Sequence, residues 1–312
     1  MKLILVVTFI GFTLNIYGQS SSIYTSDIDN FWVAYDSLQS TTDSTKQVDL
    51  IQRLYLDKAT AGFRKFILSK NISAKCLLAS VRKYPDFWKS IRPNSLHITH
   101  KKVKLDAVLK SFKSKYAAFK APELYFFIGC LNNGGTTSGQ KVLIAAEIAS
   151  ANAETNSTEL DNRMQQIMLN LNDISHVVAH EIVHTQQQSA YYGETLLAKC
   201  LVEGSADFIA ELVLESPFTT AYTKYGMEHE QVLWLKFKDE MYDNQTAGWL
   251  YNGNDPATTI PDLGYFMGYM ICKSYYEKAA NKEKAIKEII ELTPDIKSIK
   301  QFLKKSGYAD KW

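Results

Sequence analysis

The spacing of apolar and polar positions predicts helices for most of the chain. Between residues 25 and 120, apolar residues recur at intervals of three or four, the period of an amphipathic helix. This spacing predicts helices at roughly 27–38, 46–68, 72–90 and 101–119. A Ser/Thr-rich stretch at 40–45 and the tripeptide Arg92-Pro93-Asn94 predict breaks in this region.

The pattern changes in the middle of the chain, where two apolar, β-rich runs flank a turn. The runs are 123–131 and 141–148, and the residues between them are rich in Gly and Asn, which predicts a β-hairpin. An edge strand there can pair with an extended substrate backbone, or the hairpin can simply cover the core. Glu147, in the second run, either contacts a substrate or lies in solvent beside the loop.

A further helix, at about 172–192, contains the motif His180-Glu181-Ile-Val-His184. Residues four apart lie one above the other on a helix, so the two imidazoles point to the same side and can hold one zinc ion. Glu181 is rotated by about 100° from His180, which places its carboxylate beside the metal. There it can take a proton from a zinc-activated water. The competing interpretation is a helix whose histidines are ordinary core or surface groups.

The following helix offers a third ligand, because Glu203 stands in an otherwise apolar segment. A catalytic zinc site takes three protein ligands and leaves one position for water. Asp207 lies four residues further on the same face, where it can accept the outer ring N–H of a ligand histidine. Unpaired carboxylates are rare in so apolar a helix, which favours a metal site over a solvated acidic face. Gly204 has no side chain and should let this helix approach the histidine helix closely.

With these residues in place, the sequence resembles the gluzincin zinc metallopeptidases over roughly 172–214, in the motif HExxH, eighteen residues, then ExxxD. The resemblance implies that one Zn²⁺ per chain is bound by His180, His184 and Glu203. It also implies that Glu181 is the general base and that Asp207 orients the first histidine. The expected fold is α+β and mainly helical, zincin-like, with a small β-sheet or hairpin before the active-site helix.

More loosely, the whole chain is similar to uncharacterised Zn-dependent proteases among secreted bacterial proteins, including relatives of gliding-motility lipoprotein B. This similarity rests on Gly-Gly-Thr-Thr at 134–137, on His184-Thr-Gln-Gln and on the Gly-Tyr-Phe-Met-Gly-Tyr segment at 264–269. The chain departs from the lipoproteins in one respect: no Cys stands at the expected signal cleavage point, so a lipid anchor is not supported. The Gly-x-Met-Glu-Asn segment of the zinc aminopeptidases is also missing, which weakens an exopeptidase interpretation.

A zinc peptidase needs a donor for the oxyanion of the tetrahedral intermediate, in addition to the metal. Tyr265 and Tyr269 are the first candidates for this catalytic role, followed by His229 and Tyr225. Because the chain contains 18 Tyr, packing in the core is the more common role for any one of these tyrosines.

Other potential ligands are less convincing. His176 precedes His180 by one turn, but its rise of about 12 Å to His184 is too long for one ion to bridge. His97 and His100 lie three apart without a third ligand type. The four cysteines form no metal-binding or disulfide spacing, so buried free thiols are preferred at Cys76, Cys130, Cys200 and Cys272.

The first residues have the pattern of a signal peptide, with a charged start, an apolar core and small residues near Gly18. An uncleaved membrane anchor is the alternative. The expected organisation is a signal peptide at 1–18, an N-terminal helical region at 19–120 and a catalytic domain at 121–312, unless 19–312 is one compact unit. The expected location is therefore secreted or periplasmic, without a stable membrane span after cleavage.

The sequence predicts an exported zinc-dependent peptidase whose partner is a peptide or protein substrate. With a net charge of +2, no nucleic-acid partner is expected. One alternative is a cell-envelope binding or assembly protein that retains a zincin fold, and another is a zinc hydrolase of a non-peptide amide or ester. A purely structural zinc site is disfavoured, because it would not need the carboxylate of Glu181.

Overall fold

The first third of the chain is helical, as the apolar spacing predicts. The structure, a computed structural model, describes residues 23–131, 134–169, 174–187, 193–217, 219–253, 255 and 258–312. The predicted signal peptide lies outside these residues. The helices of the first third are α1 (Ser26–Ser37), α2 (Ser44–Leu54), α3 (Ala61–Lys70), α4 (Ala74–Lys83), α5 (Pro85–His97) and α6 (Lys102–Lys115), with short 3₁₀ turns η1 (Leu38–Ser40), η2 (Leu56–Lys58) and η3 (Ile98–Lys101).

The single helix predicted at 46–68 is two helices, α2 and α3. Tyr55, at the end of α2, is fully buried, and its hydroxyl group bonds both the N–H and the C=O of Ile128. Asp27 accepts hydrogen bonds from the N–H and the hydroxyl of Thr60, which caps α3. These long-range contacts end one helix and begin the next, and helical periodicity alone does not reveal them.

The helix predicted at 72–90 is also divided, because Pro85 disfavours helical backbone at the residue before it and begins α5. The break predicted at 92–94 is wrong, since Pro93 lies inside α5. Proline removes one helical hydrogen bond. Arg92 nevertheless fixes this turn of α5 against α1 through two hydrogen bonds of 2.6 and 2.8 Å to Asp36.

A four-stranded mixed sheet lies within the helices, which confirms the mainly helical α+β prediction. Its strands are β1 (Ile23–Tyr24), β2 (Glu123–Phe127), β3 (Gly135–Thr137) and β4 (Lys141–Ala145), in the order β1-β2-β4-β3. The predicted hairpin pairing is wrong: β2 and β4 are parallel, and the antiparallel partner of β4 is β3. The three residues of β3, within the predicted turn, are too few to show a period. Since β4 inserts between β2 and β3, β3 is an edge strand.

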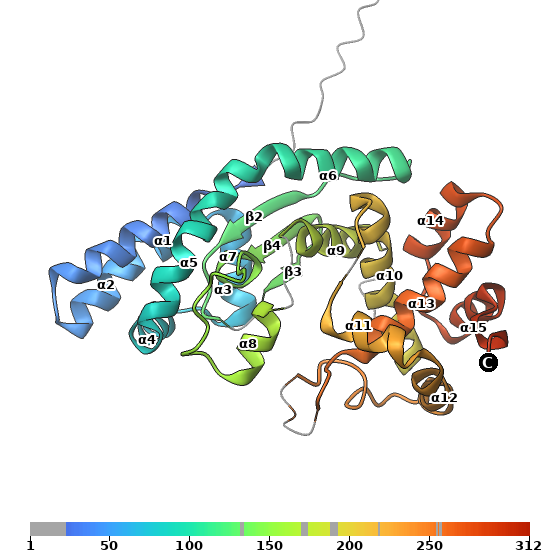
Figure 1. Cartoon of the computed structure of the whole chain (residues 1–312). Helices are drawn as coiled ribbons and strands as arrows, with labels where there is room; N and C mark the ends of the chain where they lie inside the picture. Colours follow the sequence, from blue (N-terminus) through green and yellow to red (C-terminus); the bar gives the residue numbers. More distant parts are fainter. Residues whose placement is uncertain are drawn as a thin grey trace, which may run out of the picture.

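Helices cover both faces of this sheet, so β2 and β4 are almost continuously apolar. On one face, the rings of Phe63 and Phe66 from α3 pack on Phe127 of β2. On the other face, α9 (Ile174–Gln186) contacts β3 and β4. Figure 1 shows α9 beside these strands, between the N-terminal helices and the C-terminal ones. The sheet thus supports the helix that carries the histidine motif.

The remaining helices follow the sheet. They are α7 (Ala146–Ala149), α8 (Asn162–Leu169), α10 (Leu196–Leu214), α11 (Ala221–Glu228), α12 (Glu230–Glu240), α13 (Leu263–Lys278), α14 (Lys282–Ile290) and α15 (Ile296–Ser306), with a last 3₁₀ turn η4 (Tyr308–Asp310). None of the helices in the described ranges is long and apolar enough to cross a membrane.

The closest helix contact involving Gly204 is with α13. A Cβ atom at Gly204 would lie 2.1 Å from the backbone nitrogen of Tyr269, and one at Gly268 would lie 1.7 Å from the carbonyl oxygen of Cys200. Gly204 is therefore required for close helix packing, as predicted, but the partner is α13 rather than the histidine helix. This packing fixes the turn of α10 that carries Glu203.

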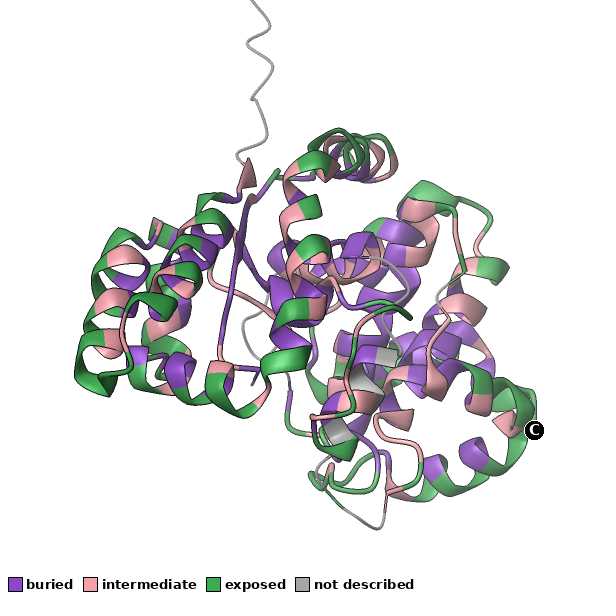
Figure 2. Ribbon diagram, turned by 60° about the vertical axis from the view of Figure 1, so that its left-hand side comes forward, coloured by how far each residue is buried: buried purple, intermediate pink, exposed green. Residues whose placement is uncertain are grey.

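One hydrophobic core runs through the described part of the chain. It contains buried residues of the N-terminal helices, of the sheet and of the C-terminal helices. Figure 2 shows these buried residues concentrated on the inward faces of the helices and in the strands. The first strand, β1, pairs with β2, so the N-terminal region contributes to the same sheet as the segment after residue 120. The domain boundary near 120 stays a prediction.

Candidate metal centre

Helix α9 brings its two histidines together as the motif predicts. The Nε2 atoms of His180 and His184 lie 3.0 Å apart, and the rings are nearly perpendicular. Both side chains are largely buried. This arrangement follows from their separation of four residues on one helix.

Glu203 of α10 completes a group of three donor atoms. Its Oε2 atom lies 3.4 Å from Nε2 of His180 and 3.3 Å from Nε2 of His184. Four ligands at ordinary zinc bond lengths around a tetrahedral ion are separated by about 3.3–3.4 Å. Within the described ranges, these three residues are the one His/Cys/Asp/Glu group with metal-binding spacing.

The hydrogen bonds behind the histidines direct their Nε2 atoms toward Glu203. Oδ1 of Asp207 lies 2.7 Å from Nδ1 of His180, and Oε1 of Gln187 lies 2.8 Å from Nδ1 of His184. An oxygen at each position accepts the Nδ1–H proton, so each Nε2 presents its lone pair to the other donors. Three electron-rich atoms at these separations repel one another unless a cation lies among them. The residues therefore fit a metal ion.

The charges of the group agree with this conclusion. Burial opposes ionisation of Glu203, but the neighbouring His184 and His180 hold the pKa of Glu203 far below its usual value. Burial likewise lowers the pKa of His180, yet its hydrogen bond with Asp207 and the negative charges of Asp207 and Glu203 outweigh burial and raise that pKa. The site is thus an anionic centre that favours positive charge between its donors.

Glu181 lies beside the three donors and against the edge strand. A Cβ atom at Gly135 of β3 would come within 2.9 Å of Oε1 of Glu181. Burial raises the pKa of Glu181, while the charges of His184 and His180 lower it. Glu181 is a partly buried carboxylate whose tip is adjacent to the edge strand, and only the absence of a side chain at Gly135 leaves room for it.

Asp207 is fully buried and is shared between two partners. Besides His180, its carboxylate accepts a hydrogen bond of 2.8 Å from the hydroxyl of Tyr222, on α11. The sequence predicted the contact with His180 but not the one with Tyr222. Tyr222 is one of 18 tyrosines, and its position depends on how α11 packs, so no local signal identifies it.

The two tyrosines predicted as oxyanion donors are placed differently. The ring of Tyr265 stacks on that of His180, with centroids 6.1 Å apart. The hydroxyl of Tyr269 instead donates to Glu211, at 2.9 and 3.0 Å from its two oxygens. Glu211 lies eight residues after Glu203, about 12 Å along the helix axis. The prediction for Tyr269 is corrected accordingly: its hydroxyl is directed away from the donor atoms.

A third tyrosine, Tyr251, lies at the donor group and was not predicted from the sequence. Tyr251 is 56% exposed, and its hydroxyl donates a hydrogen bond of 3.0 Å to Oε1 of Glu203. Its backbone N–H donates to the carboxylate of Asp262, which closes the base of the loop that carries it. The contact joins residues 48 positions apart, so no spacing rule indicates it.

None of the weaker candidates belongs to the group of three donor atoms. His229 follows α11, and its ring stacks on that of Tyr225 and bonds the Tyr225 carbonyl oxygen. His97 and His100 contact each other through their rings, and no third ligand accompanies them among the residues described. His176 is one turn before His180 on α9 and is not part of the group of three donor atoms.

Glu147 belongs to α7 and is fully buried, so both predicted environments, substrate contact and solvent, are wrong. Its carboxylate accepts hydrogen bonds from the N–H groups of Gly129 (2.9 Å) and Leu131 (3.3 Å). These bonds hold the segment that follows β2. An apolar run beside a loop does not distinguish a buried structural carboxylate from an exposed one.

The folded chain is expected to lose stability through Glu147 as the pH rises from about 5 to about 7. Burial, opposed by the backbone N–H groups of Gly129 and Leu131, raises the pKa of Glu147 from 4.5 to about 7. In this window the folded chain keeps a proton that the unfolded chain releases, so the free energy of unfolding falls by up to about 3 kcal/mol. Urea unfolding of zinc-free parent and Glu147→Gln proteins at both pH values measures this difference. An equal pH dependence in both proteins would contradict the assignment.

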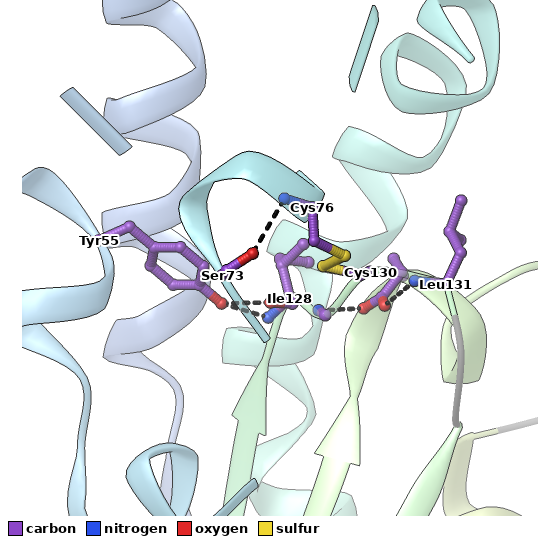
Figure 3. Close-up of a disulfide and its surroundings, with 8 residues drawn as sticks. Tyr55, Ser73, Cys76, Ile128, Cys130 and Leu131 are labelled. Atoms are coloured by element: carbon purple, nitrogen blue, oxygen red, sulfur yellow. Dashed lines mark hydrogen bonds between the residues drawn. A yellow bond between two sulfur atoms is a disulfide. The ribbon is translucent and has the colours of Figure 1, made fainter. Parts of the chain in front are cut away.

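The same segment is covalently tied to the N-terminal helices. Cys76 and Cys130 form a disulfide, with Cα atoms 6.2 Å apart, so the prediction of free thiols is wrong for this pair. Cys200 and Cys272 are free and buried, as predicted. Figure 3 shows the disulfide between the hydrogen bonds of Tyr55 and those made to Leu131. The chain is therefore held at several points just before the edge strand.

Comparison with known proteins agrees with this site. Residues 162–296 match the model of a family described as Predicted Zn-dependent protease (DUF2268). The matched segment contains His180, His184 and Glu203, and its HExxH-x18-E spacing confirms the resemblance to gluzincin-type zinc metallopeptidases. No curated protein and no solved structure matches the chain.

Proposed function

We propose that this chain is an exported zinc-dependent peptidase that hydrolyses peptide bonds in peptide or protein substrates. The observation that carries the proposal is the group of three donor atoms separated by 3.0–3.4 Å, with the carboxylate of Glu181 beside them. His180, His184 and Glu203 would hold one zinc ion per chain. The family match supports zinc as the metal and proteolysis as the reaction.

In the proposed reaction, Glu181 is the general base. When bound, zinc supplies Lewis-acid chemistry: it lowers the pKa of a water molecule and polarises a carbonyl group. Glu181 accepts the proton of the attacking water and then delivers it to the leaving amine. Its partial burial, which raises its pKa, gives this carboxylate a higher proton affinity than an exposed glutamate has.

The proposed donors for the oxyanion are Tyr265 and Tyr251. Tyr265 is packed against His180, and the hydroxyl of Tyr251 is next to Glu203, so each phenol is adjacent to one ligand. A hydroxyl directed at the developing negative charge stabilises the transition state more than the ground state. The exposed ring of Tyr251 adjoins solvent, from which a substrate enters.

The proposed substrate-binding element is the edge strand β3. It pairs with β4 on one side, and no strand of the described chain pairs with its other side. An extended peptide can add to such an edge through main-chain hydrogen bonds. Because β3 lies against Glu181, a peptide bound there would pass next to the general base.

The proposed export rests on the signal-peptide pattern at the start of the chain. The Cys76–Cys130 disulfide supports it, because structural disulfides persist mainly in oxidising compartments such as the periplasm and the extracellular space.

Adding one methyl group at Gly135 is expected to slow hydrolysis. In Gly135→Ala the new Cβ atom would lie 2.9 Å from Oε1 of Glu181, so the carboxylate must move. Misplacement of a catalytic group by about 1 Å can lower kcat by about 10²-fold, and we expect a decrease of this order without loss of zinc. Gly248→Ala is the matched control, because its Cβ atom would meet nothing within 4 Å. Equal kcat values for the two variants would contradict the proposed steric role.

Zinc removal and replacement test the proposed function. The purified protein is treated with a chelator, dialysed and supplied with Zn²⁺ or Mg²⁺, and hydrolysis of a denatured protein substrate is measured at each stage. We expect hydrolysis to disappear with zinc and to return with Zn²⁺ alone, since the His/His/Glu donor set suits zinc rather than magnesium. Hydrolysis that persists in the zinc-free protein would contradict the proposal.

A further inference from the structure

Gln187 links the second histidine of the motif to the helix that carries Glu203. Its Oε1 atom lies 2.8 Å from Nδ1 of His184. Its Nε2 group donates hydrogen bonds of 2.9 Å to the carbonyl oxygen of Val202 and 3.0 Å to the hydroxyl of Ser205. These two acceptors flank Glu203 in the sequence. One side chain therefore bridges a ligand on α9 and the ligand-bearing turn of α10.

The bridge also determines which nitrogen of His184 carries a proton. A backbone carbonyl group can only accept, so the group of Gln187 that faces Val202 must be its NH₂ group. The carboxamide oxygen then faces His184, and Nδ1 must donate to it. A neutral His184 consequently has its lone pair on Nε2, the atom 3.3 Å from Glu203. The same logic fixes His180 through Asp207, which accepts from Nδ1.

We infer that Gln187 is a positioning residue of the metal centre, which sets the tautomer and orientation of His184 before a metal binds. The inference rests on the proposed zinc site and extends it beyond the motif residues. A neutral carboxamide performs for His184 the role that the Asp207 carboxylate performs for His180. With Glu203 and Asp207 ionised, the two negative charges nearest the histidines balance one divalent ion, and Gln187 adds none.

The test compares two neighbouring amides at the end of α9, Gln186 as its last residue and Gln187 directly after it. Gln186 is a matched control: it is buried, and its carboxamide bonds the N–H and C=O of Lys120 without touching a histidine. Gln187→Met and Gln186→Met each lose a carboxamide bridge and keep a similar volume. Zinc dissociation constants, measured by competition with a chromogenic chelator, should rise by about 10–100-fold for Gln187→Met and little for Gln186→Met.

A conservative variant separates the acceptor from the donor role. Gln187→Glu keeps an oxygen for Nδ1–H of His184 but loses the two donated hydrogen bonds to α10. We expect it to keep most of the zinc affinity while its free energy of unfolding falls. Equal zinc affinity of Gln187→Met and Gln186→Met, or equal weakening in Gln187→Glu and Gln187→Met, would overturn the inference.

A measurement on the parent protein does not depend on whether a variant folds. In zinc-free protein at alkaline pH, two-bond ¹H–¹⁵N spectra report the tautomer of each neutral histidine. Protonation of Nδ1 in His184 supports the inference, and protonation of Nε2 would overturn it. A parent that binds no zinc would refute the proposed function instead, so the two failures are distinguishable.

Discussion

Glu181→Gln is expected to lower kcat for peptide hydrolysis by about 10²–10⁴-fold, the usual contribution of a general acid–base group. A carboxamide of the same size cannot accept the proton of the attacking water. Zinc affinity should change little, because Glu181 does not provide one of the three donor atoms that are separated by 3.0–3.4 Å. Steady-state rates and zinc content, measured on the same preparation, check both parts of this prediction.

Glu147→Gln is a suitable control for the Glu181 experiment. Glu147 is another glutamate near the edge strand; it is fully buried, and its hydrogen bonds hold the segment preceding that strand. Its replacement should affect stability more than kcat. A Glu181→Gln protein as active as the parent, or a loss of activity explained by loss of zinc, would contradict the proposed general base.

Glu203→Ala is expected to weaken zinc binding more than any variant outside the three donors. Loss of an outer hydrogen-bonding partner typically costs about 10–100-fold in affinity, and loss of a direct ligand should exceed that. The variant also removes the one carboxylate among the three donors, so His180 and His184 lose the negative charge opposite them. Zinc dissociation constants determined by chelator competition measure the effect.

Glu211→Ala provides the comparison for Glu203→Ala. It removes a glutamate from the same helix, two turns away, where the carboxylate accepts from Tyr269. This variant should retain the zinc affinity of the parent. Similar weakening in both variants would indicate that Glu203 acts through the stability of α10 rather than as a ligand.

The geometry of the three donor atoms was predictable because it depends largely on residues close in sequence. His180 and His184 approach each other through the helix period alone, and Glu203 and Asp207 share a face for the same reason. The only long-range requirement is that α9 and α10 pack together. The apolar residues around Glu203 indicated that its helix is buried, and the structure agrees.

The supporting contacts were not predictable in this way. Tyr222, Tyr251 and Ser205 reach the site only through the packing of helices and loops distant in the chain. Gln187 is the second of three consecutive glutamines, and the sequence does not reveal which of them faces His184. These residues belong to common types without a spacing rule.

The errors in the predicted fold also arise from contacts between residues distant in the chain. Periodicity predicted one long helix where contacts of Tyr55 and Asp27 divide it. Adjacency along the chain predicted a hairpin between two runs that pair in parallel, because the three-residue β3 intervenes. Local patterns specify the type of an element well. They specify its ends and partners poorly, because those depend on contacts made elsewhere.

The most direct test of the central claim is cleavage of an unbiased peptide mixture by the purified, zinc-loaded protein. Products are identified by mass spectrometry and compared with those of Glu181→Gln at equal zinc content. The proposed function predicts cuts that occur only with the parent protein, and their positions would report side-chain preference and any requirement for a free terminus. If the parent protein has bound zinc but makes no cuts beyond those of Glu181→Gln, the result would contradict a general peptidase. It would favour a binding role in the cell envelope.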